Sequence, residues 1–427
     1  MKLVKSLLLG TAAGIAAVAG AQAADLPSRK AAPVEYVRVC TAYGAGFFYI
    51  PGTDTCLRVG GRVRAEMGFA ERWSRGADGY GTRSYGRVQL DARTQTAFGT
   101  LRAFIRQDIY SRSGFIRYGQ YYGTTLGAAT NEPTMDKAFI QFGPITAGKA
   151  QSFFDFYASD LGFAGVINSD HSPNLFAYTA TFGGGFSATL SLEDPTTGVS
   201  RGAIGGLTRE GNSWPDVVAS LRVDQGWGSA QLAGVIANRG TYTPGAARVS
   251  SDDVGYAIEG GVKLNLPMLA AGDYLWLQGT YADGALGYLG VGTMNLGRLV
   301  LGAVPDYVTD PISGSLKSSK GYSILAALRH YWTPTIRQEV YASYTDLDVH
   351  SAVLGQRKID PRLFQVGTAV IWSPVAGLDL GVEVLYQRLE TGRRVADAKL
   401  TALGVPQLAG IKSEDAFQGR LRIQRDF

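Results

Sequence analysis

Most of the chain alternates apolar and polar side chains, the pattern of β-strands that have one apolar and one polar face. In residues 56–69, for example, Val63 and Met67 lie on the same face. Residues 85–96 and the segment that begins at residue 101 repeat the pattern. The polar face of these three predicted strands is rich in arginine. The arginines are Arg58, Arg62, Arg64, Arg87, Arg93, Arg102 and Arg106.

The spacing of such segments indicates how the strands are connected. Short turns, as at 97–99 and 226–227, alternate with long polar loops, as at 111–134 and 282–319. This rhythm is typical of up-and-down barrels and not of Greek-key sandwiches. Further strands are predicted at 135–143, 145–151, 175–182, 186–194, 216–225, 228–238, 254–266, 273–281, 320–330, 334–345, 362–372, 378–389 and 416–427. The sequence therefore predicts an all-β fold, a transmembrane antiparallel β-barrel of about 16 strands with short periplasmic turns and long extracellular loops.

One segment interrupts the alternation. Residues 146–163 read TAGKAQSFFDFYASDLGF, in which a short strand ends near Gln151 and an aromatic, acidic stretch follows. This stretch is the third long loop, and we expect it to fold into the lumen and to form a constriction at 152–162. The residues expected to form that constriction are Phe153, Phe154, Asp155, Tyr157 and Asp160.

Aromatic residues gather near the ends of strands and near the short turns. Rings that are both apolar and able to form hydrogen bonds suit the boundary between membrane and water. The last predicted strand also ends the chain in Phe427, and only Arg425 breaks its apolar face. The proposed aromatic girdle comprises Phe98, Phe142, Phe182, Phe186, Trp227, Tyr331, Trp332, Trp372 and Phe427.

The N-terminus carries the pattern of a secretory signal peptide. Lys2 and Lys5 precede an apolar core at 7–19, and Ala21-Gln22-Ala23 forms an A-x-A cleavage site. We expect residues 1–23 to be removed by cleavage between Ala23 and Ala24; a short membrane anchor is the alternative. The formal charge of +5 then falls to +3, since the segment carries two lysines. This excess is too small to indicate nucleic acid as a partner.

Cys40 and Cys56 are the only cysteines in the chain of 427 residues. The segment between them contains Gly-Ala-Gly and Pro-Gly turn signals, which favours a small hairpin. In an exported protein a disulfide is permitted, and free thiols or a redox pair are the alternatives. We therefore expect a periplasmic segment at 24–55, with a disulfide-closed hairpin, ahead of a barrel at 56–427.

Two motifs resemble those of the alphaproteobacterial porin family, the general diffusion porins. The segments VEYVRVC and YGAGFFYIPGTDTCLRVGG resemble its N-terminal signature, and AFIQFGPITAGKAQSFFDF resembles its strand pair before the third loop. The PEFGG-type motif of enteric porins is absent. The resemblance implies passive diffusion of small hydrophilic solutes and ions across the outer membrane of a Gram-negative bacterium. It also implies a homotrimer, contact with outer-membrane lipid, and insertion by the barrel-assembly machinery.

The phase of the strands predicts a basic wall. Arg420 and Arg422 in the last strand join the arginines of the first three strands, because the last strand of a closed barrel pairs with the first. Opposite them we expect the loop carboxylates Asp155 and Asp160. Such facing charges produce a transverse field that selects ions, whereas the alternative is that inward arginines only keep the lumen wet. Acidic lumen residues are expected mainly in later strands, at Glu193, Asp224, Glu259, Glu339, Asp379 and Glu383.

Catalytic and metal-binding motifs are missing from the sequence. It has three histidines, His171, His330 and His350, and no H-E-x-x-H or G-x-S-x-G motif. We expect no enzyme activity, cofactor or metal, although His171 beside Asp170 has the chemistry to bind a metal or to sense pH. The main competing hypothesis is a solute-specific channel for sugars or anions on the same barrel, with Tyr274 and Trp276 facing inward. A barrel enzyme and a secreted soluble β-protein are two more distant hypotheses.

Overall fold

The computed structural model of the chain describes residues 38–72, 75, 77–118, 130–197, 203–205, 208–209, 213–239, 241–242, 254–309, 316–351, 357–398 and 410–427. The chain divides into two compact units, of which the first ends at Cys56 and the second runs from Leu57 to Phe427. The predicted signal peptide and its cleavage site at Ala23 and Ala24 lie outside the described residues. Among the helices described, none has the length and apolar character needed to span a membrane.

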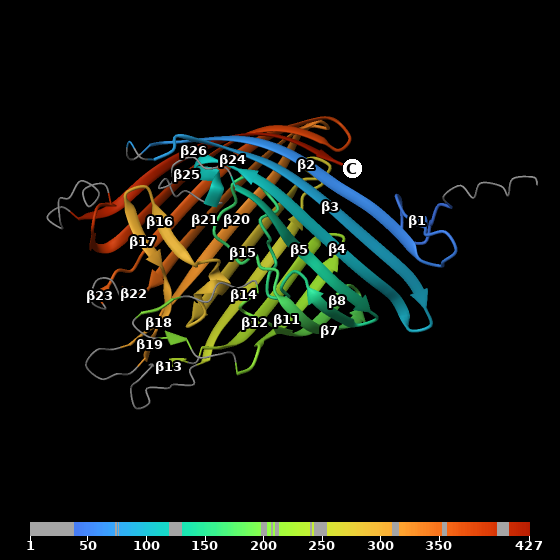
Figure 1. Cartoon of the computed structure of the whole chain (residues 1–427), viewed down its shortest axis with the longest axis horizontal. Coiled ribbons are helices and arrows are strands. Elements are labelled where there is room, and N and C mark those ends of the chain that lie inside the picture. The colour runs from blue at the N-terminus through green and yellow to red at the C-terminus, as the bar shows by residue number, and fades with distance from the viewer. Residues whose placement is uncertain are drawn as a thin grey trace, which may run out of the picture. The chain divides into compact units, whose positions relative to one another are not determined.

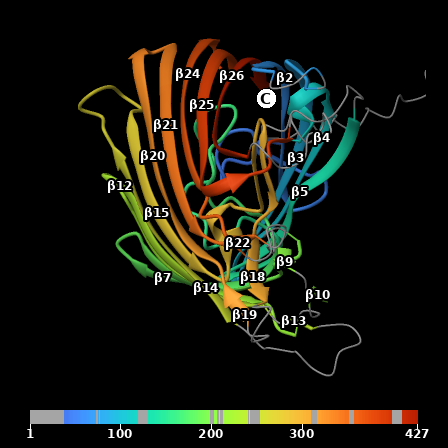
Figure 2. The ribbon, with the colours of Figure 1, turned by 90° about the vertical axis from the view of Figure 1, so that its left-hand side faces the viewer.

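In the described part of the second unit, 16 antiparallel strands form one closed barrel (Figure 1 and Figure 2). They are β2 (Cys56–Ala70), β3 (Tyr80–Thr96), β4 (Gly99–Arg112), β5 (Thr130–Phe142), β6 (Ile145–Lys149), β7 (Asn174–Gly183), β8 (Phe186–Glu193), β11 (Asp216–Gln225), β12 (Gly228–Asn238), β14 (Val254–Asn265), β15 (Tyr274–Asp283), β20 (Lys320–Thr333), β21 (Ile336–Asp348), β24 (Arg362–Val375), β25 (Leu378–Val395) and β26 (Ile411–Asp426). The predicted fold class is confirmed.

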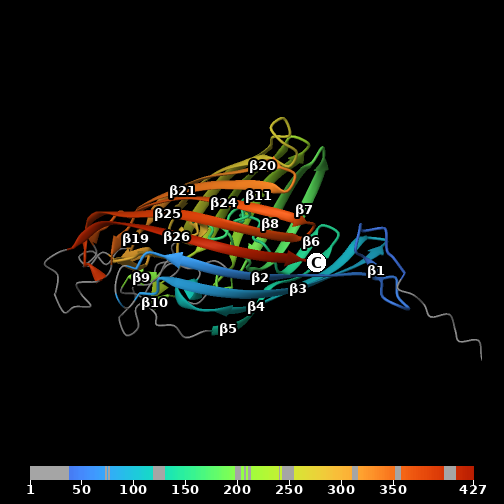
Figure 3. The same cartoon turned by 90° about the horizontal axis from the view of Figure 1, so that it is seen from above.

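The first and last strands close the barrel. β26 pairs with β2 in antiparallel register, from Arg62 opposite Asp426 to Ala70 opposite Gln418 (Figure 3). The hydrogen bonds from Gly61 N to Phe427 O (2.9 Å) and from Phe427 N to Gly61 O (3.1 Å) extend this pairing to the end of the chain. Closure leaves no strand edge with unpaired N–H and C=O groups. The interior of a membrane does not tolerate such unpaired groups.

The strands alternate between an exposed apolar face and an inward face, as predicted. On β12, Leu232 and Ile236 are half exposed, whereas Ala233 and Val235 are buried. Apolar residues on the outside of a closed barrel are typical of outer-membrane barrels. Eight of the nine predicted girdle aromatics are exposed, and Tyr331 is half-buried.

Arg425 is a charged residue on the outward, mainly apolar face of β26, and its side chain extends toward the end of the strand. Its Nη1 donates a hydrogen bond to the carbonyl oxygen of Ala376 in the turn between β24 and β25. The long side chain thus carries its charge to the end of the strands, as an amphipathic side chain does at an interface.

Several strands are longer than predicted. β3 begins five residues earlier than expected, at Tyr80, and β5 begins at Thr130. Their added residues are mostly polar, so the alternation on which the prediction rests is missing there. Short strands also occur within the long loops. They are β9 (Ala203–Gly205), β10 (Thr208–Arg209), β13 (Thr241–Tyr242), β16 (Thr293–Leu296), β17 (Leu299–Ala303), β18 (Pro305–Thr309), β19 (Leu316–Ser318), β22 (His350–Ser351) and β23 (Arg357–Lys358).

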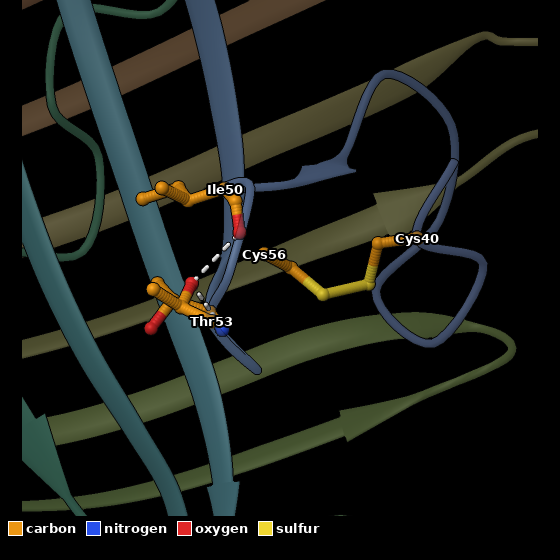
Figure 4. Close-up of a disulfide and its surroundings, with 5 residues drawn as sticks. Cys40, Ile50, Thr53 and Cys56 are labelled. Carbon is orange, nitrogen blue, oxygen red and sulfur yellow. Dashed lines mark hydrogen bonds between the residues drawn. A yellow bond between two sulfur atoms is a disulfide. The ribbon is translucent and has the colours of Figure 1, made fainter. Parts of the chain in front are cut away.

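The first unit is a small hairpin that contains β1 (Phe48–Tyr49). Cys40 donates its N–H to Phe47 O (2.9 Å), and a disulfide joins Cys40 to Cys56 across a Cα–Cα distance of 6.0 Å (Figure 4). In the same view Thr53 Oγ1 donates to Ile50 O (3.0 Å). The predicted disulfide is confirmed; closing a loop of this size stabilises by about 3 kcal/mol in the chain-entropy model.

Substitution of Gly61 tests how much the β2–β26 pairing at the closing seam contributes to the stability of the barrel. A Cβ at this position overlaps the ring of Phe427 and lies 2.6 Å from the carbonyl oxygen of Arg87. Because a backbone carbonyl cannot rotate away, we expect Gly61→Ala to destabilise the folded barrel by about 1–3 kcal/mol. Urea unfolding of the refolded barrel measures this change. Gly279→Ala, in a strand glycine with open space around it, is the matched control and is expected to have little effect.

Candidate functional site

Between β6 and β7 the chain leaves the barrel wall and crosses the lumen, where it is drawn in green in Figure 2. Residues 150–173, called the constriction loop below, contain no regular secondary structure. Gly148, just before the loop, has a φ of +118°, and its backbone lies against Ala138 so closely that a side chain does not fit. Only glycine therefore fits at this position, which is the second-last residue of β6 and leads into the loop.

Three glutamates on the barrel wall hold the backbone of the constriction loop. The N–H groups of the loop have no strand partner, and buried donors of this kind need an acceptor. These acceptors are three of the acidic residues that the sequence placed in the lumen, and they therefore anchor the loop; Glu339 also lines the cavity described below. The bonds run from Phe153 N to Glu193 (3.1 Å), from Gly162 N to Glu339 (2.8 Å) and from Ala164 N to Glu383 (2.9 Å).

Glutamine side chains and aromatic rings complete this attachment. Gln278 accepts the N–H of Tyr157 (2.9 Å), and Gln365 accepts the N–H of Ile167 (2.7 Å). The Tyr157 ring is fully buried, and the ring centroid of Trp276 lies 5.6 Å from it. Trp276 is itself buried, so it belongs to the support of the loop and does not face the open lumen.

Asp155 does not lie where the sequence analysis expected it. Its carboxylate is buried within the loop, where it accepts hydrogen bonds from Gln151 Nε2 (2.5 Å), Ser169 Oγ (2.5 Å) and the N–H of His171 (2.6 Å). This carboxylate therefore fastens the two arms of the loop together. Burial opposes protonation of His171, but the hydrogen bond and charge of Asp155 raise the pKa of His171 above its usual value.

A cavity of about 880 Å³ lies between the constriction loop and the barrel wall. On the loop side the exposed carboxylates are Asp160, as expected, and Asp170, which the sequence analysis considered only as a neighbour of His171. The barrel-wall side includes six arginines, called the cavity arginines below. They are Arg62, Arg64, Arg83, Arg87, Arg106 and Arg422. The same side also includes the cations Lys137, Arg329 and Arg337 and the carboxylates Asp136, Glu339, Asp379 and Asp426.

Acidic residues neutralise most of the cavity arginines. Glu66 lies between Arg83 and Arg422, at 2.5 Å from the latter, and is buried. Arg64, in contrast, has no carboxylate within 4 Å among the described residues and donates instead to Gln424 (2.8 Å). The remaining ion pairs join Arg62 to Asp426 (2.5 Å), Arg87 to Asp108 (2.8 Å) and Arg106 to Asp136.

The other predicted arginines do not line this cavity. Arg93 and Arg102 both bind Asp91, at 2.7 and 2.9 Å, and Arg58 is exposed on β2. Arg420 is buried and donates to the carbonyl oxygen of Phe163 (3.2 Å). Strand phase identifies the inward face correctly, but it does not tell at which height along the strand a side chain meets the loop.

The last strand grips the constriction loop at one residue. Arg422 Nη2 also donates to Phe163 O (3.0 Å), and its guanidinium carbon lies 3.9 Å from the centre of the Phe163 ring. Arg83 was not identified by the sequence analysis, because the predicted strand begins at residue 85. It lies on β3, where the inward phase would have identified it had the strand been extended.

Two further acids of the predicted lumen set have local partners. Glu259 is buried and accepts hydrogen bonds from Gln278 (2.9 Å) and Thr280 (2.9 Å), whereas Asp224 is exposed and pairs with Arg222 (2.7 Å). Across the described ranges, no three His, Cys, Asp or Glu side chains are grouped as a metal site.

Comparison with known proteins agrees with this geometry. Residues 25–415 match the family model described as "Porin subfamily". "Porin Omp2b" of Brucella suis biovar 1 (strain 1330) is 37% identical over 293 residues, which cover 66% of this chain and 75% of the relative. The protein of the same name from Brucella abortus (strain 2308) has the same identity and coverage. The outer membrane channel DcaP of Acinetobacter baumannii has a similar fold, with a TM-score of 0.65 at 16% identity over 89% of this chain and 99% of that one.

Glu383 tests the anchoring of the loop. Glu383→Ala removes the acceptor of the Ala164 N–H and of the Tyr341 hydroxyl (2.5 Å). Since each buried group left without a partner costs about 1–3 kcal/mol, we expect a less stable barrel and a noisier open channel. Urea unfolding and planar-bilayer recordings measure the two effects. Glu390→Ala, which removes a partly exposed carboxylate of the same strand, is the control; an equal effect there would contradict the anchoring role.

Proposed function

Because this chain belongs to the porin subfamily, we propose that its lumen selects solutes by a transverse electric field between the cavity arginines and the constriction loop. The chain is a general diffusion porin of the Gram-negative outer membrane, through which small hydrophilic solutes and ions pass passively. The proposal concerns what this channel prefers.

The placement of opposite charges on the two sides of one cavity supports the field. Asp160 and Asp170 lie on the loop side, and the cavity arginines lie on the wall. In a narrow, partly dehydrated space such charges interact at a lower effective dielectric than in bulk water. A dipolar solute that passes between them is expected to align its negative end with the wall.

The excess of positive charge on the wall supports a preference for anions. Arg64 lies near Arg62, Arg83 and Arg422, while Glu66 is the carboxylate closest to this group apart from the Asp426 bound to Arg62. Arg64 thus carries an uncompensated charge into the cavity. We propose that it is the main determinant of anion preference.

Export and assembly form part of the proposal. We propose that residues 1–23 are cleaved after Ala23, and that the barrel-assembly machinery recognises β26. The outward apolar residues of that strand and its terminal Phe427 support recognition of this kind. We further propose that the barrel contacts lipid through its apolar face and assembles as a homotrimer, as the resemblance to the family implies.

A solute-specific channel is the second candidate. Tyr274 supports it, because Lys263 and Arg329 lie over its ring at 4.2 and 4.9 Å and create a stacked cationic surface. Lys263 also lies 5.3 Å from the centre of the Trp276 ring, but that ring is buried and packs edge to face against Phe156 at 4.5 Å. A conductance that saturates with one solute in bilayer recordings would favour this candidate over general diffusion.

Substitution of Arg64 tests whether the transverse electric field determines the ion preference of the channel. Arg64→Gln removes one uncompensated charge from the cavity and leaves a shorter polar side chain in its place. We expect the reversal potential in a salt gradient to shift toward cations, because the remaining wall charges are largely neutralised. Arg102→Gln removes the same charge from an arginine bound to Asp91 outside the cavity, and we expect a smaller shift. Equal shifts in the two variants, or none in Arg64→Gln, would contradict the proposal.

A further inference from the structure

A second long segment lies inside the barrel, against the inner face of its wall. It joins β15 to β20, and its residues 284–309, called the inner plug below, contain η2 (Leu286–Leu289), β16, β17 and β18, of which the strands are labelled in Figure 1. We propose that the inner plug is a second constriction element, which closes the β11–β15 side of the lumen and confines solutes to the side of the cavity arginines. The proposal rests on the chain acting as a diffusion channel.

The inner plug is packed as a protein core is. Leu286, Leu289 and Leu299 are fully buried, and Met294 and Leu296 are 2% exposed. A segment that only covered the mouth of a water-filled pore would leave one face wet. Complete burial of these side chains requires apolar partners on all sides.

Those partners come from the inward face of the wall. Residues Val218, Ala233, Ala237, Ala257 and Ala282 belong to the same buried cluster as the inner plug. They lie on β11, β12, β14 and β15, at the strand ends joined to the long loops. At the same end of the barrel the cluster also includes Leu347, Leu363, Leu389 and Ala416, on β21, β24, β25 and β26. Small apolar side chains on an inward face are unusual for a pore lining, which is polar in porins. This part of the lumen is therefore dry.

The inner plug also holds the constriction loop. The rings of Phe154 and Tyr288 meet edge to face at a centroid distance of 4.9 Å, and Ile167 belongs to the same cluster. Gly290, with a φ of +79°, lies so close to the carbonyl of Asn168 that a Cβ there would overlap it. The two segments therefore form one body.

Buried charges fix the inner plug to the wall. Arg239 lies between Asp216 (3.2 Å) and Asp306 (3.4 Å), and all three side chains are at most 3% exposed. Tyr288 donates its hydroxyl hydrogen to Asp216 (2.9 Å), and Leu286 N donates to Asp306 (2.8 Å). Breaking a buried ionic network of this kind is costly, so it holds the segment in one position.

The lining of the cavity agrees with a closed half. In the described chain, the wall residues that line it come from β2 to β5 and from β20 to β26, and none comes from β6 to β15. The cavity thus lies beside the closing seam. The inner plug fills the β11–β15 side of the lumen and reaches β26 only near the long loops, where Arg298 binds Glu414 (2.9 Å). The size of the barrel alone would overestimate the size of the pore.

Thiol modification tests whether the closed half is dry. The native cysteines are bonded to each other, so a water-soluble methanethiosulfonate reports only on an introduced thiol. We expect Ala257→Cys, on the wall behind the inner plug, to resist modification in the folded barrel. Ala164→Cys, which lines the cavity, is the control and is expected to react and to reduce conductance. Modification at both positions at comparable rates would overturn the proposal.

Tyr288 tests the effect on transport. Tyr288→Ala removes the contact with Phe154, and we expect single-channel conductance to rise on the order of 1.5-fold, with weaker ion selectivity. Tyr288→Phe keeps the ring and is expected to retain the conductance of the original protein. An unchanged conductance in a folded Tyr288→Ala barrel would contradict the proposal. Thiol modification needs no conducting channel, so failure of the inner plug and failure of the diffusion function are distinguished.

Discussion

A backbone that leaves strand pairing inside a barrel must find other partners for its N–H and C=O groups, and this constraint shapes the lumen. The constriction loop has no strand beside it, so side chains from distant strands supply its acceptors and donors. Glu193 and Glu383 accept its N–H groups, and Arg420 and Arg422 donate to its carbonyl at Phe163. Charges that a sequence pattern assigns to the pore are thereby used to hold the element that narrows the pore.

The same barrel wall serves two opposite environments. On β2 to β4 the inward face is charged and meets water, whereas on β11 to β15, near the long loops, it is formed by Ala and Val and meets the inner plug. Period-two alternation is strong in the first part and weak in the second, because both faces of the second part are apolar. The change of pattern along the chain therefore marks the change from wet lumen to dry core.

The barrel was predictable from the sequence, because every strand crosses the same two media and repeats the same pattern. The constriction loop coincides with the segment of the sequence in which the alternation stops. The roles of single residues within the site were not predictable. Asp155 and Asp170 are both acidic residues of one loop. Only the fold determines that the first is buried and accepts a hydrogen bond from Ser169, and that the second faces the cavity. Glu383 has the phase of a pore residue, and its use as an anchor depends on a contact 219 residues away in the chain.

The contact between β26 and Phe163 couples closure of the barrel to the width of its passage. The partners of this contact are separated by 257 and 259 residues, and both arginines lie on the strand that pairs with β2 at the seam. A change that separates β26 from β2 therefore also displaces two donors that hold the constriction loop. The seam and the narrowest part of the lumen are consequently one structural unit.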